Sequence, residues 1–130
     1  MSIADSSLPL AATIPFCGTH VLGEIHQLSF DILNDGVYLT QLLREAVGIA
    51  GATVCGDLSK AFEPQGVTIL FLLEESHASI HTFPEAGSLF LDIFTCGERC
   101  KPALAFEHVR AALKSDVFSL QQIVRGARAV

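Results

Sequence analysis

Apolar residues recur along this chain with two different spacings, which separate the expected helices from the expected strands. Between residues 39 and 50 they recur every three or four positions, as on the buried face of a helix. Asn34 or Asp35 can cap the start of that helix. A second helix is expected from Pro102 to about Lys114, because proline suits a first helical turn.

The remaining apolar segments lack the helical spacing and are expected to form strands. They are short and bounded by turn signals such as Pro84-Glu85-Ala86-Gly87. The most apolar of them, residues 67–73, is expected to be buried on both faces in the centre of a sheet. The expected strands cover residues 20–29, 52–57, 67–73, 78–83, 88–95 and 117–124.

The order of these segments, β-α-β-β-β-β-α-β, predicts an α+β fold. Short turns between consecutive strands favour a largely antiparallel sheet with the two helices on one face. The other face of such a sheet needs cover, and a second copy of the chain supplies it most simply, as an α/β/β/α dimer. Residues 1–15 are expected to form a flexible N-terminal arm before a single domain at 16–130.

Composition and charge narrow the classes of function. The chain has 130 residues and is half apolar, which fits one domain. Its net charge of −6 argues against nucleic acid as a partner, since no basic patch can replace phosphate counterions. It has neither a basic signal-peptide start nor an apolar run near the roughly 20 residues of a membrane helix. No membrane association is therefore expected, and the expected location is the cytoplasm, where the four cysteines would be thiols.

Ionisable residues gather directly after the most apolar strand, in residues 74–85 (EESHASIHTFPE). On composition alone, a solvated turn with hydrogen-bonded histidines explains them best. A metal site is not expected, because His77 and His81 would stand about 13 Å apart on an extended strand, whereas zinc ligands lie about 2 Å from the ion. Cys96 and Cys100 are also a weak zinc signal, since no second cysteine pair accompanies them.

Two motifs in this part of the chain change that interpretation. Residues 75–85 combine Glu-Ser-His with Ile-His-Thr-Phe-Pro-Glu, and residues 92–98 read Asp-Ile-Phe-Thr-Cys-Gly-Glu. In this order and spacing they resemble the signature of the pyruvoyl-dependent S-adenosylmethionine decarboxylases, in the short bacterial and archaeal form. The similarity extends over about residues 18–114. It implies an enzyme that converts S-adenosylmethionine to decarboxylated S-adenosylmethionine, the aminopropyl donor for spermidine biosynthesis.

The resemblance also implies how the cofactor is made. The chain would cleave itself between Glu75 and Ser76, giving a β chain of residues 1–75 and an α chain of residues 76–130. Ser76 would become a pyruvoyl group that forms a Schiff base with the α-amine of an amino-acid-type substrate. Neither pyridoxal phosphate nor a metal would be needed.

Three further residues match positions that take part in the family's chemistry. Cys96 matches the proton donor of the decarboxylation step. His81 matches the histidine that acts as a base during processing. Thr68 falls where relatives usually have a serine hydroxyl that assists processing, so this chain departs from the pattern there.

The resemblance assigns the substrate pocket to residues with less specific matches. Phe62 falls at the position of an aromatic ring against adenine, and Glu85 at that of a carboxylate on the ribose hydroxyls. Phe83 occupies a position that is usually aromatic, and Thr19 departs from a commonly basic position. A carboxylate such as Glu85 can also pair with a guanidinium, so L-arginine or L-ornithine stays open as an alternative substrate.

The spacing of Ser76 and His81 bears on assembly. They are five residues apart, which puts them on opposite faces of a regular strand and about 16 Å from each other. The family solves this with a homodimer of cleaved units that pairs residues across two chains. By that analogy, one chain contributes Ser76 and Cys96, and its partner contributes Phe62, Thr68, His81 and Glu85.

Two other classes of function remain open from the sequence. A homologue that dimerises but never cleaves would be non-catalytic. A cysteine hydrolase that uses Cys96 and His81 is a weaker alternative, because no oxyanion-hole motif accompanies these residues.

Overall fold

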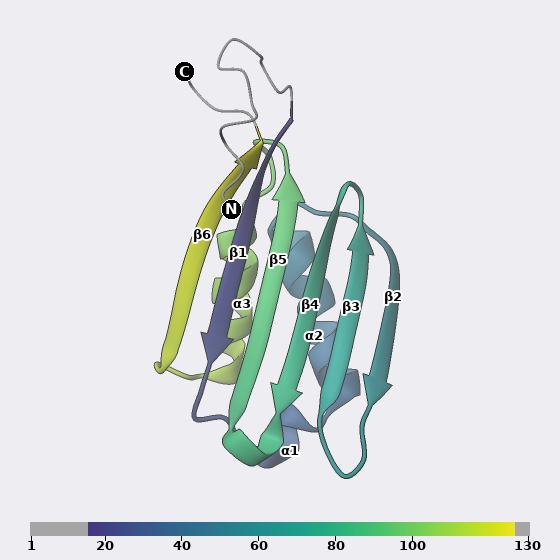
Figure 1. Cartoon of the computed structure of the whole chain (residues 1–130), viewed down its shortest axis with the longest axis vertical. Coiled ribbons are helices and arrows are strands. Elements are labelled where there is room, and N and C mark those ends of the chain that lie inside the picture. Colours follow the sequence, from purple (N-terminus) through teal and green to yellow (C-terminus); the bar gives the residue numbers. More distant parts are fainter. Residues whose placement is uncertain (1–15, 127–130) are drawn as a thin grey trace, which may run out of the picture.

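An antiparallel sheet of six strands forms the framework, and the helices of the described residues lie on one face of it (Figure 1). The computed structural model describes residues 16–126, so the arm expected at 1–15 lies outside the described residues. The strand order is β2-β3-β4-β5-β1-β6, and every neighbouring pair is antiparallel. The strands are β1 (Cys17–Ile25), β2 (Val54–Ala61), β3 (Val67–Leu73), β4 (Ser76–Phe83), β5 (Ser88–Cys96) and β6 (Phe118–Gly126).

The helices are α1 (Phe30–Leu33), α2 (Gly36–Ile49) and α3 (Pro102–Leu113). The two longer ones and the antiparallel sheet confirm the predicted α+β class. Asp35 caps α2, because its carboxylate accepts a hydrogen bond from the backbone N–H of Tyr38 at 3.0 Å. Within residues 16–126, no helix has both the length and the apolar character needed to span a membrane.

Two short elements were not predicted, namely α1 and the 3₁₀-helix η2 (Pro84–Ala86). A helix of three or four residues spans about one turn, so its apolar residues cannot repeat with a helical period. The first of them also shortens the strand before it. The strand expected at 20–29 ends at Ile25, because Gln27 has a left-handed φ of 62° and interrupts the extended backbone. Ser29 then caps α1 by accepting a hydrogen bond from the N–H of Ile32.

One expectation about the core is wrong, because β3 is buried on only one face. Its odd-numbered positions belong to the core between sheet and helices. Leu70 and Leu72 point the other way and are 45% and 62% exposed. Apolar residues at nearly every position predicted burial on both faces, but within the described residues only one face is covered.

The face of the sheet opposite the helices, which we call the open face, carries many apolar side chains. Strand register places Leu58 beside Leu70, and alternation along each strand places the others on the same side. A group of exposed apolar residues on one sheet face is typical of an interaction surface. The exposed apolar residues of this face are Leu22, Leu58, Leu70, Leu72, Phe83, Phe90 and Ile123.

The packing of α3 on β1 gives a first testable prediction. A methyl group at Gly23 would overlap the ring of Phe106, which is 1% exposed in the core. We expect Gly23→Ala to lower the free energy of unfolding by about 1–3 kcal/mol, the usual cost of overpacking. Urea denaturation followed by circular dichroism measures this change.

Gly48→Ala is the matched control for that measurement. Gly48 lies in α2, and no heavy atom of the described residues outside its own surroundings comes within 4 Å of an added methyl group. The control should therefore raise the free energy of unfolding by about 0.5–1 kcal/mol through helix propensity. Equal stability of Gly23→Ala and the unchanged protein would contradict the described packing of Phe106.

Candidate active site

The turn between β3 and β4 holds the first group of predicted site residues. Leu73 pairs with Ser76, so Glu74 and Glu75 form a two-residue hairpin turn. Glu75 has a φ of 57°, in the left-handed region. A residue with a Cβ atom pays roughly 1–2 kcal/mol for that conformation. Backbone strain is thus located at the residue that precedes Ser76.

A thiol contacts the same turn. Cys96 is the last residue of β5, and its Sγ lies 3.2 Å from the carbonyl oxygen of Glu75, to which it donates a hydrogen bond. The register of β4 and β5 explains this contact: His77 pairs with Phe94 in an antiparallel ladder, so the residue two positions before His77, Glu75, comes opposite the residue two positions after Phe94, Cys96. The structure therefore brings together Glu75, Ser76 and Cys96 at one end of the sheet, which we call the hairpin end.

The second group lies further along the same strands. Thr68 on β3 pairs with His81 on β4, and the hydroxyl oxygen of Thr68 lies 3.1 Å from Nδ1 of His81. His81 lines a depression of about 420 Å³ on the open face, together with Glu24, Phe90 and residues of β5 and β6. The structure thus brings two of the predicted site residues, Thr68 and His81, into contact on the open face.

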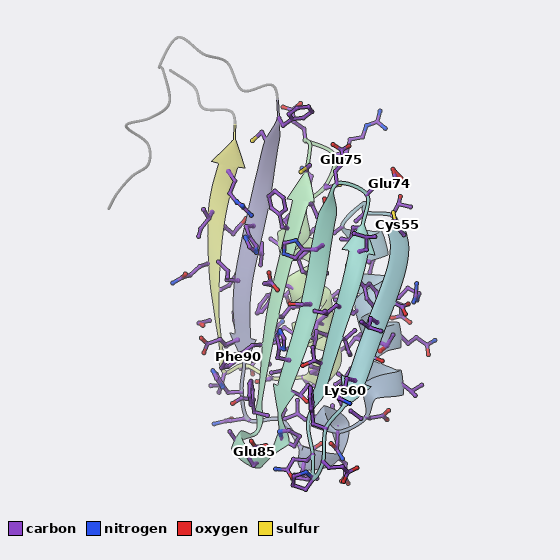
Figure 2. All side chains as sticks on the ribbon, turned by 45° about the vertical axis from the view of Figure 1, so that its right-hand side comes forward. Cys55, Lys60, Glu74, Glu75, Glu85 and Phe90 are labelled. Atoms are coloured by element: carbon purple, nitrogen blue, oxygen red, sulfur yellow. The ribbon has the colours of Figure 1, made fainter. Side chains whose placement is uncertain are left out.

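The candidate pocket residues lie towards the opposite end of the sheet from the hairpin end, as the labels of Glu75 and Glu85 in Figure 2 show. The Phe83 ring packs 5.0 Å from that of Phe90. Glu85, in η2, accepts a hydrogen bond from the side chain of Gln65 at 3.3 Å. Phe62 follows β2 and is 45% exposed, with the ammonium of Lys60 5.9 Å from its ring.

Within one chain these groups do not form a single site. β4 is continuous from Ser76 to Phe83, so Ser76 and His81 stand about 16 Å apart along it. His81 pairs with Phe90, and Cys96 lies six residues further along β5, or about 20 Å away. Cys96 and His81 therefore cannot act as a nucleophile and base within one chain.

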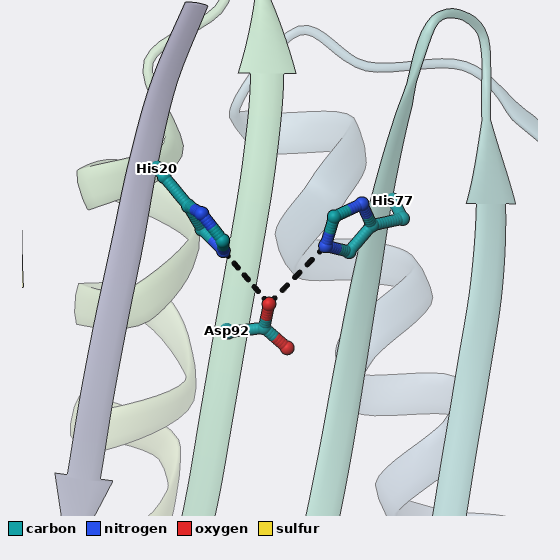
Figure 3. Close-up of side chains that lie close together, drawn as sticks. All are labelled: His20, His77 and Asp92. Atoms are coloured by element: carbon teal, nitrogen blue, oxygen red, sulfur yellow. Dashed lines mark hydrogen bonds and ion pairs between the residues drawn. The ribbon is translucent and has the colours of Figure 1, made fainter. Parts of the chain in front are cut away.

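A polar network on the open face was not predicted (Figure 3). His20 on β1 and His77 on β4 both direct Nε2 at Oδ2 of Asp92 on β5, at 2.8 and 3.2 Å. Ser79 donates a hydrogen bond to the other carboxylate oxygen, Oδ1. The sequence gives no hint of this network, because its residues come from three strands and meet only through the register of the sheet.

The network keeps Asp92 ionised. Burial by itself raises the pKa of the Asp92 carboxyl, but the hydrogen bonds from Ser79, His20 and His77 outweigh burial and lower that pKa below its usual value. At neutral pH the group is therefore a carboxylate with an accepted hydrogen bond on each oxygen. Notably, one of its two imidazole partners is the residue that directly follows Ser76.

Known proteins resemble this chain over most of its length. The sequence model of a family described as S-adenosylmethionine decarboxylase matches residues 19–126. A protein of Brevibacillus brevis named S-adenosylmethionine decarboxylase proenzyme is 43% identical over 109 residues, which cover 84% of this chain and 82% of that protein. A protein of Symbiobacterium thermophilum with the same name is 40% identical, over 87% of this chain and 86% of its own length.

A solved structure matches the fold as well. The crystal structure of the adenosylmethionine decarboxylase from Aquifex aeolicus superimposes with a TM-score of 0.79 and 30% sequence identity. The superposition covers 92% of this chain and 96% of that one. Sequence and structure thus point to the same relatives.

Proposed function

The chain belongs to the S-adenosylmethionine decarboxylase family, and we propose that it is a pyruvoyl-dependent carboxy-lyase whose precursor cleaves itself between Glu75 and Ser76. It decarboxylates S-adenosylmethionine, the substrate named in relatives that are 36–43% identical to it over the aligned residues. The observation that best supports self-cleavage is the hydrogen bond from the Cys96 thiol to the carbonyl oxygen of Glu75, which lies in a strained turn directly before Ser76.

Self-cleavage follows from the chemistry of these groups. The Ser76 hydroxyl attacks the Glu75 carbonyl carbon, the C–N bond breaks, and the freed nitrogen takes the hydroxyl proton, which leaves an ester. Removal of the Ser76 α-proton then expels the Glu75 carboxylate and leaves dehydroalanine at position 76. This residue tautomerises and is hydrolysed by water to a pyruvoyl group and ammonia.

The surroundings of the scissile bond favour the first step. The Glu75 carbonyl oxygen gains negative charge in the tetrahedral intermediate, and the S–H of Cys96 already points at that oxygen. The left-handed φ of Glu75 raises the energy of the intact turn, and cleavage releases that strain. These features fit a precursor whose residue 76 becomes the cofactor.

After cleavage the same residues are close to the bound substrate. A pyruvoyl group at position 76 supplies an electron-accepting carbonyl for loss of carbon dioxide from an α-amino acid. Cys96 lies beside that position and can deliver a proton from Sγ. The relatives' names argue against L-arginine or L-ornithine as the substrate.

We also propose that two copies assemble through their open faces. The exposed apolar residues of that face would become buried, giving the expected α/β/β/α arrangement. If the second copy is turned end for end, its Thr68, His81, Phe62, Phe83 and Glu85 reach the hairpin end of the first copy. The dimer would then supply the residues that one continuous strand keeps apart.

Intact mass spectrometry and trapping test the enzymatic proposal. The purified protein should consist of chains 1–75 and 76–130, whereas Ser76→Ala should stay whole because alanine has no nucleophile. Borohydride should attach S-adenosylmethionine to the cleaved protein only, and neither arginine nor ornithine. A single full-length species after prolonged incubation would instead identify a non-catalytic homologue.

The strain at the hairpin gives a second prediction. Glu75→Gly should slow self-cleavage about three- to tenfold, because glycine adopts the left-handed conformation without the roughly 1–2 kcal/mol penalty. The rate is measured by mass spectrometry of freshly purified precursor. Gln27→Gly is the matched control, since Gln27 also has a positive φ, of 62°, but lies outside the β3–β4 hairpin. Unchanged or faster cleavage of Glu75→Gly would contradict a role for strain.

Assembly across two chains predicts complementation. Neither Ser76→Ala nor His81→Ala alone should cleave efficiently. In mixed dimers from co-expression, Ser76 of the His81→Ala chain faces the intact histidine of its partner, so only that chain should be cut. Differently tagged chains reveal which one is cut. If the His81→Ala chain stays whole in the mixture, the two residues act within one chain.

A further inference from the structure

The residue after Ser76 is held by a carboxylate that the reaction itself does not use. We propose that Asp92 is a positioning residue that anchors the new end of the chain created by self-cleavage. Its partners on that end are His77 and Ser79, the first two residues of β4 that face the open side. The inference rests on the proposed function, because the end exists only once the chain has been cut.

Cleavage removes the covalent support of this end. In the precursor, a two-residue turn ties the start of β4 to β3. Once the bond before Ser76 is broken, residue 76 is a chain terminus, and termini fray unless they are tied down. Fraying here would carry the cofactor-bearing residue away from Cys96.

The core holds the new end weakly. The first buried side chain of β4 is Ala78, a single methyl group, and the first large one is Ile80. A methyl group contributes about a third as much hydrophobic burial as a large aliphatic side chain. Residues 76–79 therefore depend on strand hydrogen bonds and on contacts made from the open face.

Asp92 supplies those contacts from the next strand. It lies directly opposite Ser79 in the register of β4 and β5. Its carboxylate accepts a hydrogen bond from Ser79 on Oδ1 and one from His77 on Oδ2. It therefore binds both of the side chains in residues 76–79 that lie on the open face. The His77 ring also packs 5.9 Å from that of Phe94 and 5.5 Å, edge to face, from that of His20.

The contact of His20 with Arg125 favours a hydrogen-bond network over a metal site. The nearest ligand atoms of His20, His77 and Asp92 lie within 4.8 Å of one another, which is close enough for a cation. However, the Arg125 guanidinium lies 3.4 Å from Nδ1 of His20 and can only donate. Nδ1 is then the acceptor, and Nε2 carries the proton that it donates to Asp92. A metal would require the lone pair of that Nε2.

Hydrogen exchange of cleaved and uncleaved protein tests the anchor. In cleaved protein, Asp92→Ala should speed amide exchange in residues 77–80 about tenfold or more, as expected when hydrogen bonds to a charged group are lost. In the uncleaved Ser76→Ala background the same substitution should change the exchange rate of these amides by less than about twofold, because the turn still connects β4 to β3. The value of kcat should fall by a similar factor to the rise in exchange, with KM changed less than about twofold.

Two further variants and one control make the test specific. Asp92→Asn should recover much of the loss, since its carbonyl still accepts from both imidazoles and its amide can donate to Ser79. Ser79→Ala removes one hydrogen bond and leaves Asp92 in place, so it should give a smaller increase in exchange. It serves as the test variant if Asp92→Ala fails to fold or to cleave. Asp57→Ala is the control: it breaks the ion pair between Asp57 on β2 and Arg44 on α2, and it should alter neither the amide exchange of residues 77–80 nor kcat.

The outcomes separate this inference from the proposed function. Uncleaved wild-type protein would refute the proposed function and the anchor with it. Cleaved wild-type protein with unchanged exchange in Asp92→Ala, Asp92→Asn and Ser79→Ala would refute the anchor alone. So would equal acceleration in cleaved and uncleaved protein, which indicates a general structural role. One zinc ion per chain that survives dialysis against chelator and is absent from Asp92→Ala would show a metal site instead.

Discussion

The extended backbone of β4 fixes the distance between the two halves of the candidate site. A strand advances about 3.3 Å per residue, and β4 runs without interruption from Ser76 to Phe83. No rotation of a side chain brings the imidazole of His81 to the Ser76 hydroxyl within one sheet. The proposal of a second copy follows from this distance, and the exposed apolar residues of the open face indicate the surface through which it would bind.

The thiol of Cys96 occupies a position that serves both stages of the proposed chemistry. In the intact chain it donates to the Glu75 carbonyl, and after the proposed cleavage it would lie next to residue 76. The strain in the turn, by contrast, can be used only once, because it disappears with the bond. Cleavage would therefore release the strain, and it would also leave the product without the turn that had held β4 against β3.

Periodicity predicted the elements of the fold, but it could not predict which face of each element would be covered. Residues 67–73 are apolar on both faces because the open face is itself apolar, and pattern alone cannot distinguish such a strand from a fully buried one. The short helix α1 gave no periodic signal. The strand register, which decides side-chain neighbours, depends on turns whose lengths were uncertain by a few residues.

The residues of the candidate site could likewise be predicted from local motifs, whereas the contacts between distant residues could not. Ser76, His81 and Cys96 could be proposed from the sequence because they belong to motifs that are contiguous in sequence. The contact of Cys96 with Glu75 joins residues 21 apart, and that of His20 with Asp92 joins residues 72 apart. Nothing in the local sequence specifies such pairs. A partly buried carboxylate is costly unless its oxygens are satisfied, and Asp92 satisfies both through two residues of the strand that cleavage would release. An apolar residue at position 92 would cover the open face at least as well, so the polar network calls for a role beyond packing.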